Sequence, residues 1–417
     1  MFYGITSRGK FQTSDELSVF VTGASLATRG QLQIDEFQWL QDRVNIGQTG
    51  PDGHLYIKYF PGNVLASALV YKLTARADDD AYVWSNVGVV PSVTGARWCT
   101  RINALWGALG MTALLLLLRR YFDWRTAIAT VVLVGACSDW WYQSRGFFSE
   151  VGSGAFLMAG LCFAAYEKPS GSALGLALSM LFRPTNLLAL PIWASTVWRK
   201  GIRTLLSGLI IIAAIGGLAL YNWLRFRSPL NFGYGGEGFS ASLLNGLYGV
   251  LLSPGRSIFV YSPVLLLAVP GAILFFRKEK TLTTLCLITV ITFSVAIGHW
   301  HAWAGGLSWG SRLMTAIVPV LGVLIAPTLQ RAWKNKWIAL AAVLLAVAGF
   351  SVQVISLLRD PTRVIIEQVT NGNVKWEETL YSVKDSWLAL QVRSLSNWQS
   401  CDLDSYTLRR WLTNCPE

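Results

Sequence analysis

The chain has 417 residues, of which 53% are hydrophobic and only 14% are charged. A water-soluble protein of this size cannot hide so much apolar surface behind so few charges, so the composition excludes that class. The net charge of +12 would suit nucleic acid. However, the basic residues cluster in short loops between apolar runs, which is typical of a membrane protein and predicts no nucleic-acid partner.

Residues 1–101 form the first predicted region, which lies outside the membrane. Its first residues include basic side chains but no apolar core, so no signal peptide is predicted. Apolar residues recur at helical spacing in 14–29 and again in 62–73. This spacing predicts two short amphipathic helices that lie at the membrane surface.

Residues 102–358 form the predicted transmembrane domain. About ten apolar segments predict an all-α polytopic membrane protein with external juxtamembrane helices and loops. The segments are 102–118, 126–142, 151–166, 170–182, 184–198, 204–224, 257–276, 281–298, 313–330 and 337–358. Around Pro184, residues 170–198 form either one kinked helix or a two-pass hairpin. Only the hairpin collects most basic loops on one side, which the positive-inside rule identifies as cytoplasmic.

With this arrangement, five polar regions lie outside: 1–101, 139–150, 225–256, 299–312 and 359–417. The last of them is an external C-terminal tail with several Trp and Leu residues among its charges, which predicts a small mixed cap. Cys401 and Cys415 lie in this tail. They can pair if the tail is extracytoplasmic, and the sequence alone leaves this open.

Two groups of residues in the N-terminal region could have either a structural role or a catalytic or binding role. Ser14 is the predicted N-cap of a helix, and Asp15 and Glu16 in the first turn would stabilise any helix. A capped helix also holds a carboxylate rigidly, so the two interpretations are compatible. Lys58 stands among aromatic residues, where it either snorkels to the interface or binds a phosphate as a compact cation.

Later external segments combine acids, aromatic residues and arginines. Glu150 opens an apolar segment, where an acid favours helix formation in any protein. One late loop contains Tyr234 and Arg256. The next contains His301, Trp303, Trp309 and Arg312. Trp is common at membrane interfaces, but aromatic rings also stack on sugars, and Arg binds phosphate.

All three histidines, His54, His299 and His301, fall in external regions. A His-X-His pair with nearby carboxylates can bind a metal, but residues two apart face the same way only in a strand. A neutral, hydrogen-bonding histidine is therefore favoured. No cofactor and no metal site are predicted, and a divalent metal stays an open alternative.

In chain order, these segments resemble the GT-C glycosyltransferases related to protein mannosyltransferases and aminoarabinose transferases. Asp15-Glu16 matches an acidic pair in the family's first external loop, and Lys58 with Pro61 matches a Lys closely followed by Pro later in that loop. The stretch from Phe147 to Glu150 matches a short, aromatic-rich external turn that ends in an acid. Further similar stretches are Leu181 to Pro184, Tyr221 to Pro229, Leu252 to Arg256 and Trp303 to Arg312. The resemblance covers about residues 11–330. The family has a membrane helix before its first external loop, so the first helix is expected to be missing here.

The resemblance implies an inverting sugar transfer from a polyprenyl-phosphate donor in the bilayer to a hydroxyl or amine of a glycan, lipid or protein. The site is expected on the extracytoplasmic face of the plasma (inner) membrane. We expect Asp15 to act as the base and Glu16 to orient it. Lys58, Arg256 and Arg312 are expected to bind the donor phosphate. The residues expected to position the acceptor or shape the pocket are Glu150, His54, Tyr234, His301, Trp303 and Trp309.

Two other classes of function suit a polytopic protein. A secondary transporter usually carries ionisable residues at mid-membrane depth. Here the apolar segments are nearly free of them, and Asp139 and Glu150 stand at segment ends. A non-catalytic scaffold of the same fold is the second alternative. The acids at the outer edge favour the glycosyltransferase.

Overall fold

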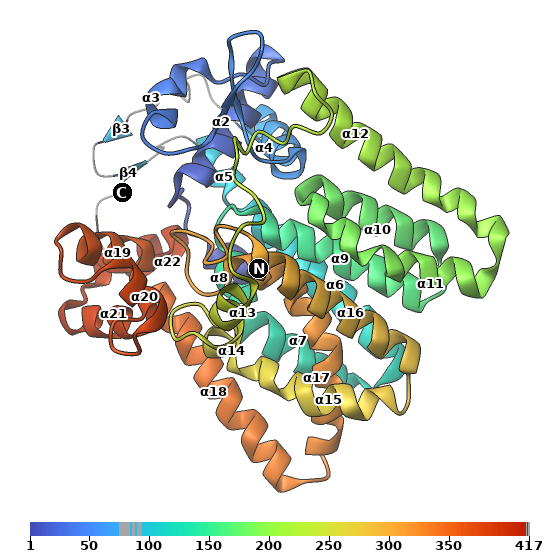
Figure 1. Ribbon diagram of the computed structural model, residues 1–417. Helices are drawn as coiled ribbons and strands as arrows, with labels where there is room; N and C mark the ends of the chain where they lie inside the picture. The colour runs from blue at the N-terminus through green and yellow to red at the C-terminus, as the bar shows by residue number, and fades with distance from the viewer. Residues whose placement is uncertain (75–83, 86–87, 90–93, 414, 416–417) are drawn as a thin grey trace.

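The computed structural model describes residues 1–74, 84–85, 88–89, 94–413 and 415. Helices dominate it (Figure 1), and the strands among the described residues form two short antiparallel pairs. The strands are β1 (Gly47–Thr49), β2 (Leu55–Ile57), β3 (Trp84–Ser85) and β4 (Gly88–Val89). The predicted all-α class is therefore confirmed.

The N-terminal region is a small helical layer at one end of the molecule (Figure 1). Its helices are α1 (Phe2–Ile5), α2 (Ser14–Arg29), η1 (Asp35–Phe37), α3 (Gln38–Gln41), α4 (Pro61–Thr74) and α5 (Thr94–Cys99). The two predicted helices are thus present as α2 and α4, which pack against each other. The predicted cap was one residue off, because Thr13 is the N-cap and its hydroxyl accepts from the Glu16 amide.

Helix α2 is more buried than its amphipathic spacing suggested. All residues from Glu16 to Ser25 are buried. Phe20 and Leu17 belong to a hydrophobic core that also includes Phe147, from the loop before the third apolar segment. The first turn of α2 is therefore held rigidly against the membrane bundle, which matters because Asp15 and Glu16 lie there.

The bundle contains the predicted apolar segments. Its elements are α6 (Ile102–Tyr121), α7 (Trp124–Ala136), α8 (Asp139–Gln143), α9 (Ser149–Ala165), α10 (Pro169–Phe182), η3 (Pro184–Ala189), α11 (Leu190–Lys200), η4 (Ile202–Ser207), α12 (Gly208–Phe226), α13 (Leu243–Leu252), α14 (Ile258–Tyr261), η5 (Pro263–Leu267), α15 (Ala268–Phe276), α16 (Lys280–His299), η6 (Arg312–Ile317), α17 (Val318–Ala332) and α18 (Lys336–Leu358). Among the described residues, five helices are long and apolar enough to cross a membrane, and five shorter apolar helices accompany them. The chain is a multi-pass membrane protein.

One predicted segment, 126–142, is not a single helix. It divides into α7 and α8, because Cys137 leaves the helical conformation and the Ser138 hydroxyl caps the amide of Trp140.

Helices α9 and α10 pack closely against each other along their length. A methyl group on Gly175 would lie 2.5 Å from the backbone nitrogen of Gly160, so glycine is required for this approach.

Residues 170–198 form the predicted hairpin. Arg183 has an extended backbone that ends α10, and Pro184 starts the return through η3 and α11. The far end of α11 reaches back to the start of α10, where Lys200 Nζ lies 2.7 Å from Glu167 Oε2. The structure therefore confirms the hairpin.

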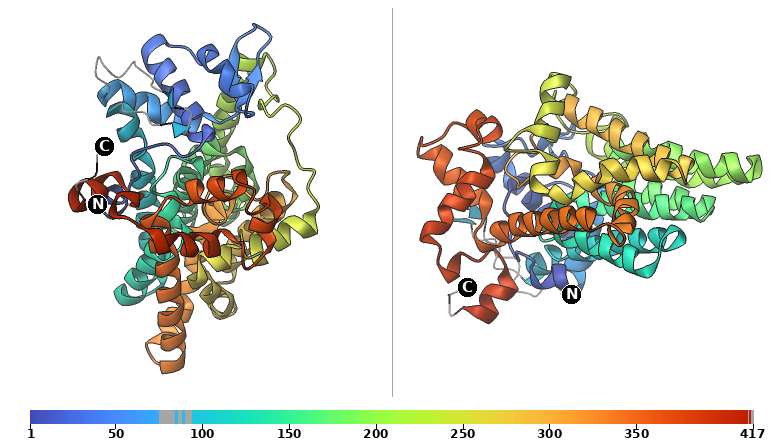
Figure 2. Two further views of the ribbon diagram at one scale, coloured as in Figure 1. Left: turned by 90° about the vertical axis from the view of Figure 1, so that its left-hand side faces the viewer. Right: turned by 90° about the horizontal axis from the view of Figure 1, so that it is seen from below.

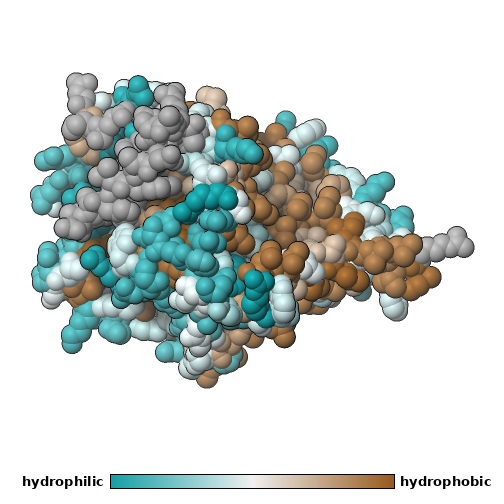
Figure 3. Space-filling view, turned by 90° about the horizontal axis from the view of Figure 1, so that it is seen from above, coloured by the Kyte–Doolittle hydropathy of each residue, from teal (hydrophilic) through white to brown (hydrophobic). Residues whose placement is uncertain are grey.

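The basic loops meet at one end of the bundle, away from the N-terminal region. Lys278 Nζ donates to the carbonyl of Tyr121 at 3.2 Å, and the Arg120 guanidinium lies 5.1 Å from the ring of Tyr166. A broad hollow lies between residues 123–125, next to Tyr121, and residues 330–338, which include one further basic loop. In Figure 3 hydrophilic residues gather toward the left of the visible face, whereas hydrophobic residues predominate toward its right, with some hydrophilic residues near the right-hand end.

The C-terminal tail packs as a helical cap beside the N-terminal region (Figure 2). It contains α19 (Pro361–Thr370), α20 (Trp376–Tyr381), α21 (Trp387–Ser394), η7 (Leu395–Asn397), η8 (Ser400–Asp402) and α22 (Tyr406–Leu412). Trp387 is fully buried in a core that includes Tyr261 from α14 and Trp309 from the loop before η6. Cys401 and Cys415 form a disulfide with a Cα–Cα distance of 5.6 Å.

Candidate functional site

A narrow cleft of about 30 Å³ lies where α2, the segment before α4 and the ends of α9, α10 and η6 meet. All of these helix ends point toward the N-terminal region. The cleft is lined by Asp15, Glu16, Val19, Tyr59, Phe60, Asn63, Phe147, Phe148, Ser149, Glu150, Arg183 and Arg312. It therefore joins four of the predicted site residues from distant parts of the sequence.

Asp15 faces the opening of this cleft. Its side chain is 30% exposed, and its Oδ2 accepts from Arg312 Nη1 at 3.2 Å. Burial and the adjacent Asp15 carboxylate raise the pKa of Tyr59 well above its ordinary value, so the Tyr59 phenol stays protonated. Asp15 is thus an accessible carboxylate between a cation and a phenol.

Glu150 lies deeper, and its side chain is only 1% exposed. It forms a close ion pair with Arg183 Nη2, and its Oε1 lies 3.4 Å from Arg312 Nε. Its second oxygen has no hydrogen-bond partner among the described residues. Two carboxylates and two guanidinium groups therefore alternate in the order Asp15, Arg312, Glu150 and Arg183.

Sequence reasoning treated Arg183 as a topology marker and missed it as a site residue. The structure brings it into the cleft because α10 ends there with an extended residue before Pro184. A charged residue in the turn of a membrane hairpin was the available signal. Nothing in the sequence pointed to Glu150 as its partner.

Glu16 is fastened inside the protein. Its two oxygens accept from the backbone amides of Phe147 at 2.6 Å and Gln12 at 2.7 Å. Burial raises the pKa of Glu16, while the nearby Arg8 and the two amide hydrogen bonds act in the opposite direction. Glu16 thereby ties the first turn of α2 to the wall of the cleft.

A second cluster adjoins the cleft at Phe60. Lys58 Nζ donates to both oxygens of Glu237, at 2.8 and 3.0 Å, and lies 5.7 Å from the centre of the Tyr234 ring. Tyr234 contacts Phe60 with ring centres 6.2 Å apart. His301 Nε2 lies 3.5 Å from Glu237. Three predicted residues thus meet around Glu237, an acid that the sequence did not single out.

Arg256 does not line the cleft. It is buried, and its guanidinium donates to the backbone carbonyls of Ser308, Gly310 and Gly306. It also lies 4.1 Å from the ring centre of Trp387. Burial lowers the pKa of Arg256 to about 10. Its observed contacts hold the loop that precedes Arg312 rather than an exposed phosphate site.

Three other predicted residues also lie outside the cleft lining. Trp309 is fully buried against Tyr261, with ring centres 4.9 Å apart. Trp303 packs near Tyr381 in the tail. His54 Nδ1 lies 2.7 Å from Asp35 Oδ2 on the exposed rim of the N-terminal region. These three side chains do not line the cleft because they are buried elsewhere or contact residues away from it.

His299 and His301 face different partners. His299 Nδ1 contacts the carbonyl of Ala241 at 2.7 Å, whereas His301 approaches Glu237. His299 ends α16 and His301 lies in the turn that follows, so they share no strand. Within the described part of the chain, no group of three or more His, Cys, Asp or Glu residues could hold a metal ion.

Comparison with known proteins identifies the fold. No protein-family model and no curated protein matches the sequence. The apo crystal structure of ArnT from Cupriavidus metallidurans is similar with a TM-score of 0.56 and 14% identity, over 94% of this chain and 73% of that one. The same protein bound to undecaprenyl phosphate gives a TM-score of 0.54 at 14% identity and the same coverage. The apo oligosaccharyltransferase of Archaeoglobus fulgidus gives 0.48 at 12% identity, over 90% of this chain and 57% of that one. The chain has the fold of the GT-C membrane glycosyltransferases.

Proposed function

We propose that this protein is a membrane glycosyltransferase that moves a sugar from a polyprenyl-phosphate donor to an acceptor hydroxyl or amine, with inversion. The observation that carries the proposal is the cleft itself. It combines an accessible acid, Asp15, with Arg312 and Arg183, at the ends of membrane helices. Such a site offers a base and a cation pair at the depth where a lipid-linked phosphate would lie.

Asp15 is the proposed general base. Of the acids in the cleft, it has the most exposed side chain, whereas Glu16 and Glu150 are buried. Glu16 accepts hydrogen bonds on both oxygens, and Glu150 is paired with Arg183 through one oxygen. Asp15 removes the proton of the acceptor as the acceptor oxygen or nitrogen attacks the anomeric carbon. The bond from that carbon to the donor phosphate breaks, and the phosphate leaves with the electron pair.

Arg312 and Arg183 are the proposed partners of the leaving phosphate. Both are charged and flank Glu150, which holds them in place through ion pairs. Guanidinium groups bind phosphate oxygens in a planar fork, and their effect is greatest where water is excluded. Lys58 would contribute a third positive charge from the adjacent cluster, in exchange for its present contact with Glu237.

The adjoining aromatic residues suit a sugar. Tyr234 contacts Phe60 at the edge of the cleft and Trp300 on its other side, with ring centres 5.3 Å apart. Sugar C–H faces stack on such rings, while Glu237 and His301 offer hydrogen bonds nearby. We therefore assign this cluster to sugar or acceptor recognition.

Two observations support a site on the extracytoplasmic side. The disulfide between Cys401 and Cys415 belongs to an oxidising compartment, and its tail packs at the same end as the cleft. The basic loops gather at the other end, as the positive-inside rule expects for the cytoplasm. A polyprenyl-phosphate partner is supported by the similar ArnT structure with undecaprenyl phosphate.

The proposal is tested with the full-length protein in lipid nanodiscs and a panel of radiolabelled undecaprenyl-phosphate pentoses and hexoses. Asp15→Asn keeps the size of the side chain but removes its basicity. It should lower sugar transfer by roughly 10²- to 10⁴-fold, the usual contribution of a general base. Lipid extraction and counting of the labelled product measure the rate.

The matched control is Asp42→Asn, an exposed acid of the same region whose side chain contacts only Gln38 among the hydrogen bonds described. This variant should transfer sugar at the wild-type rate. Near-normal transfer by Asp15→Asn would remove Asp15 as the base, and no transfer by the wild-type protein from any donor of the panel would refute the donor class.

A further inference from the structure

The two ends of the chain meet beside the cleft. The amide of Tyr406 donates to the carbonyl of Ser7 at 3.1 Å, and Ser405 Oγ donates to the carbonyl of Ile5 at 2.9 Å. The amide of Asp404 donates to Leu357 at the end of α18. A short tail segment is therefore fixed between the last membrane helix and the chain that leads into α2.

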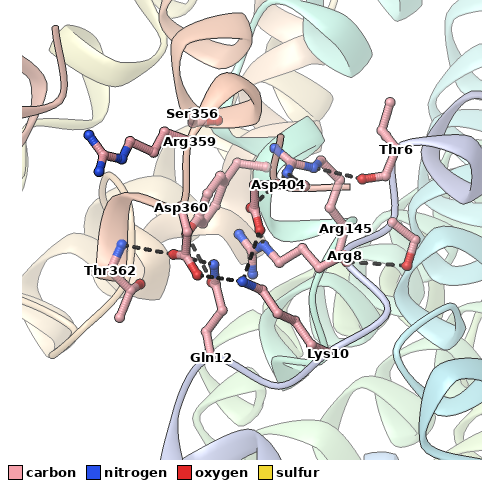
Figure 4. Close-up of polar contacts among 12 residues, drawn as sticks. Thr6, Arg8, Lys10, Gln12, Arg145, Ser356, Arg359, Asp360, Thr362 and Asp404 are labelled. Carbon is pink, nitrogen blue, oxygen red and sulfur yellow. Dashed lines mark hydrogen bonds and ion pairs between the residues drawn. The ribbon is translucent and has the colours of Figure 1, made fainter. Parts of the chain in front are cut away.

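Asp404 is the centre of a buried charge network (Figure 4). Its Oδ2 accepts from Arg8 Nε at 3.2 Å and from Arg145 Nη2 at 2.8 Å, and all three side chains are almost completely buried. Lys10 Nζ lies 3.9 Å from Asp404 Oδ1 and 3.0 Å from Asp360 Oδ2, so Lys10 connects Asp360 to the network. Buried ion pairs of this kind hold only while every charge keeps its partner.

The network reaches Glu16 through Arg8. A methyl group on Gly146 would lie 2.5 Å from Arg8 Nη1 and 2.9 Å from Glu16 Oε1, so both groups border the same small space. The two Nη atoms of Arg8 have no hydrogen-bond partner among the described residues. Counting Glu16, the network balances three positive charges with three negative ones: Arg8, Lys10 and Arg145 against Glu16, Asp360 and Asp404.

We propose that Asp404 is a positioning residue for the catalytic cleft, acting through Arg8 on Glu16 and hence on the first turn of α2. This inference rests on the proposed function. Asp404 holds the Nε side of the Arg8 guanidinium, which leaves Glu16 free to accept from Phe147 and Gln12. The C-terminal tail thereby completes the site without lining it.

The physical consequence of losing Asp404 follows from this geometry. Arg8 and Arg145 would face each other without their shared counter-ion, in a place from which water is excluded. Arg8 would then turn to the nearest remaining acid, Glu16, and draw it away from the amide of Phe147. Asp15, which precedes Glu16 in the same helical turn, would then move relative to Arg312.

The test compares Asp404→Asn with Asp402→Asn in the full-length protein in nanodiscs. Asp402 lies two residues earlier in the same disulfide loop and approaches Arg359 at 3.9 Å, away from Arg8. Asp404→Asn should lower the kcat of sugar transfer by roughly 10- to 100-fold, as a small misplacement does, with little change in donor KM. Asp404→Glu, which keeps the charge, should restore part of the loss.

Hydrogen–deuterium exchange supplies a readout that does not depend on activity. Asp404→Asn should speed exchange in residues 8–20 although they lie at the other end of the sequence, and Asp402→Asn should not. If exchange in residues 8–20 is unchanged while the tail itself opens, the coupling to Glu16 is refuted. If the wild-type protein transfers no sugar, the proposed function fails, and exchange still decides the coupling.

A second variant covers the case in which Asp404→Asn does not fold. Arg8→Lys keeps the positive charge and the pairing with Asp404 but removes the Nη groups that face Glu16. Because no Nη group is left to draw Glu16 away from Phe147, Arg8→Lys should keep a near-wild-type kcat and unchanged exchange in residues 8–20. A loss of kcat as large as that expected of Asp404→Asn would overturn the proposal.

Discussion

At the residue scale, Asp15 and Glu16 have opposite environments although they are neighbours in the chain. Successive residues of a helix point about 100° apart, so one side chain can face a cleft while the next faces the interior. Asp15 meets Arg312 at the opening, and Glu16 is held by two backbone amides inside. The acidic pair therefore divides into one accessible carboxylate and one structural carboxylate.

A substitution at Gly146 would test how tightly the protein is packed around Arg8 and Glu16. Gly146→Ala would push a methyl group against Arg8 and Glu16. We expect the free energy of unfolding to fall by about 1–3 kcal/mol, as overpacking of a dense core does, and sugar transfer to fall with it. Thermal unfolding in detergent measures the first effect.

The control for that substitution is Gly216→Ala. Gly216 lies in α12, and apart from its chain neighbours and the nearby backbone of its own helix, no atom lies within 4 Å of the position that its added methyl group would take. Its stability should be unchanged or slightly raised, because alanine favours a helix over glycine. Equal losses from the two substitutions would contradict the packing argument.

Arg183 tests the second guanidinium of the cleft. Arg183→Ala removes the charge next to Glu150, and we expect donor KM to rise and kcat to fall by at least about tenfold, the loss of one charge-assisted hydrogen bond. Arg183→Lys should recover only part of the activity, since a lysine cannot reproduce the planar fork. Steady-state transfer at varied donor concentration measures both constants.

Arg363→Ala is the comparison for Arg183. Arg363 is exposed on the tail helix α19 and pairs with Glu367 four residues along. Its removal should leave both kinetic constants at the wild-type level. An equal effect of the two alanine variants would mean that net charge, rather than the cleft, determines donor binding.

At the element scale, the tail is tied down by its own cross-link. Cys401 and Cys415 enclose α22 and Asp404 in a loop with a sequence separation of 14 residues. A disulfide closing a loop of this length stabilises by about 3 kcal/mol in the chain-entropy model. Replacing both cysteines by serine should speed hydrogen–deuterium exchange in α22 and, through the charge network, in the chain before α2.

Reducing agent provides the matching control for this element. It should change exchange in the wild-type protein in the same way and have no effect on the double-serine variant. Cys99, Cys137, Cys162 and Cys286 are buried and unpaired, so reduction has no other bond to break among the described cysteines. Unaltered exchange in the reduced wild-type protein would show that the tail is held without the cross-link.

At the scale of the whole molecule, the basic loops and the proposed site lie at opposite ends. The basic loops meet at one end of the bundle, while the cleft, the N-terminal region and the disulfide-linked tail share the other. The helices between them are apolar and exposed on the outside, as Leu209 and Ile212 of α12 illustrate. This arrangement suits a substrate whose lipid part stays in the bilayer while its phosphate reaches the cleft.

The sequence by itself determined the class of protein, most of its apolar segments and the hairpin at Arg183, but it missed the short apolar helix α13 within the predicted external region 225–256. These properties depend on local composition and on the sign of the loop charges. Both can be counted along a single sequence, because an apolar segment enters lipid by its own composition and basic loops stay on the cytoplasmic side. It also predicted that Asp15 and Lys58 belong to one N-terminal region, and the structure places both in that region. Its segment boundaries were less accurate where a buried polar residue such as Ser138 interrupts a helix.

Only the tertiary structure decided which polar groups share the cleft. Arg183 meets Glu150 and Arg8 meets Asp404 across long stretches of chain, and a single sequence contains no record of such pairs. The sequence predicts Arg256 as a phosphate ligand, and only the structure shows that its guanidinium donates to the backbone carbonyls of Gly310 and Gly306. The physical reason is that the effect of a buried charged group depends on the groups that it contacts. Those contacts join residues far apart in the sequence and form only when the chain folds.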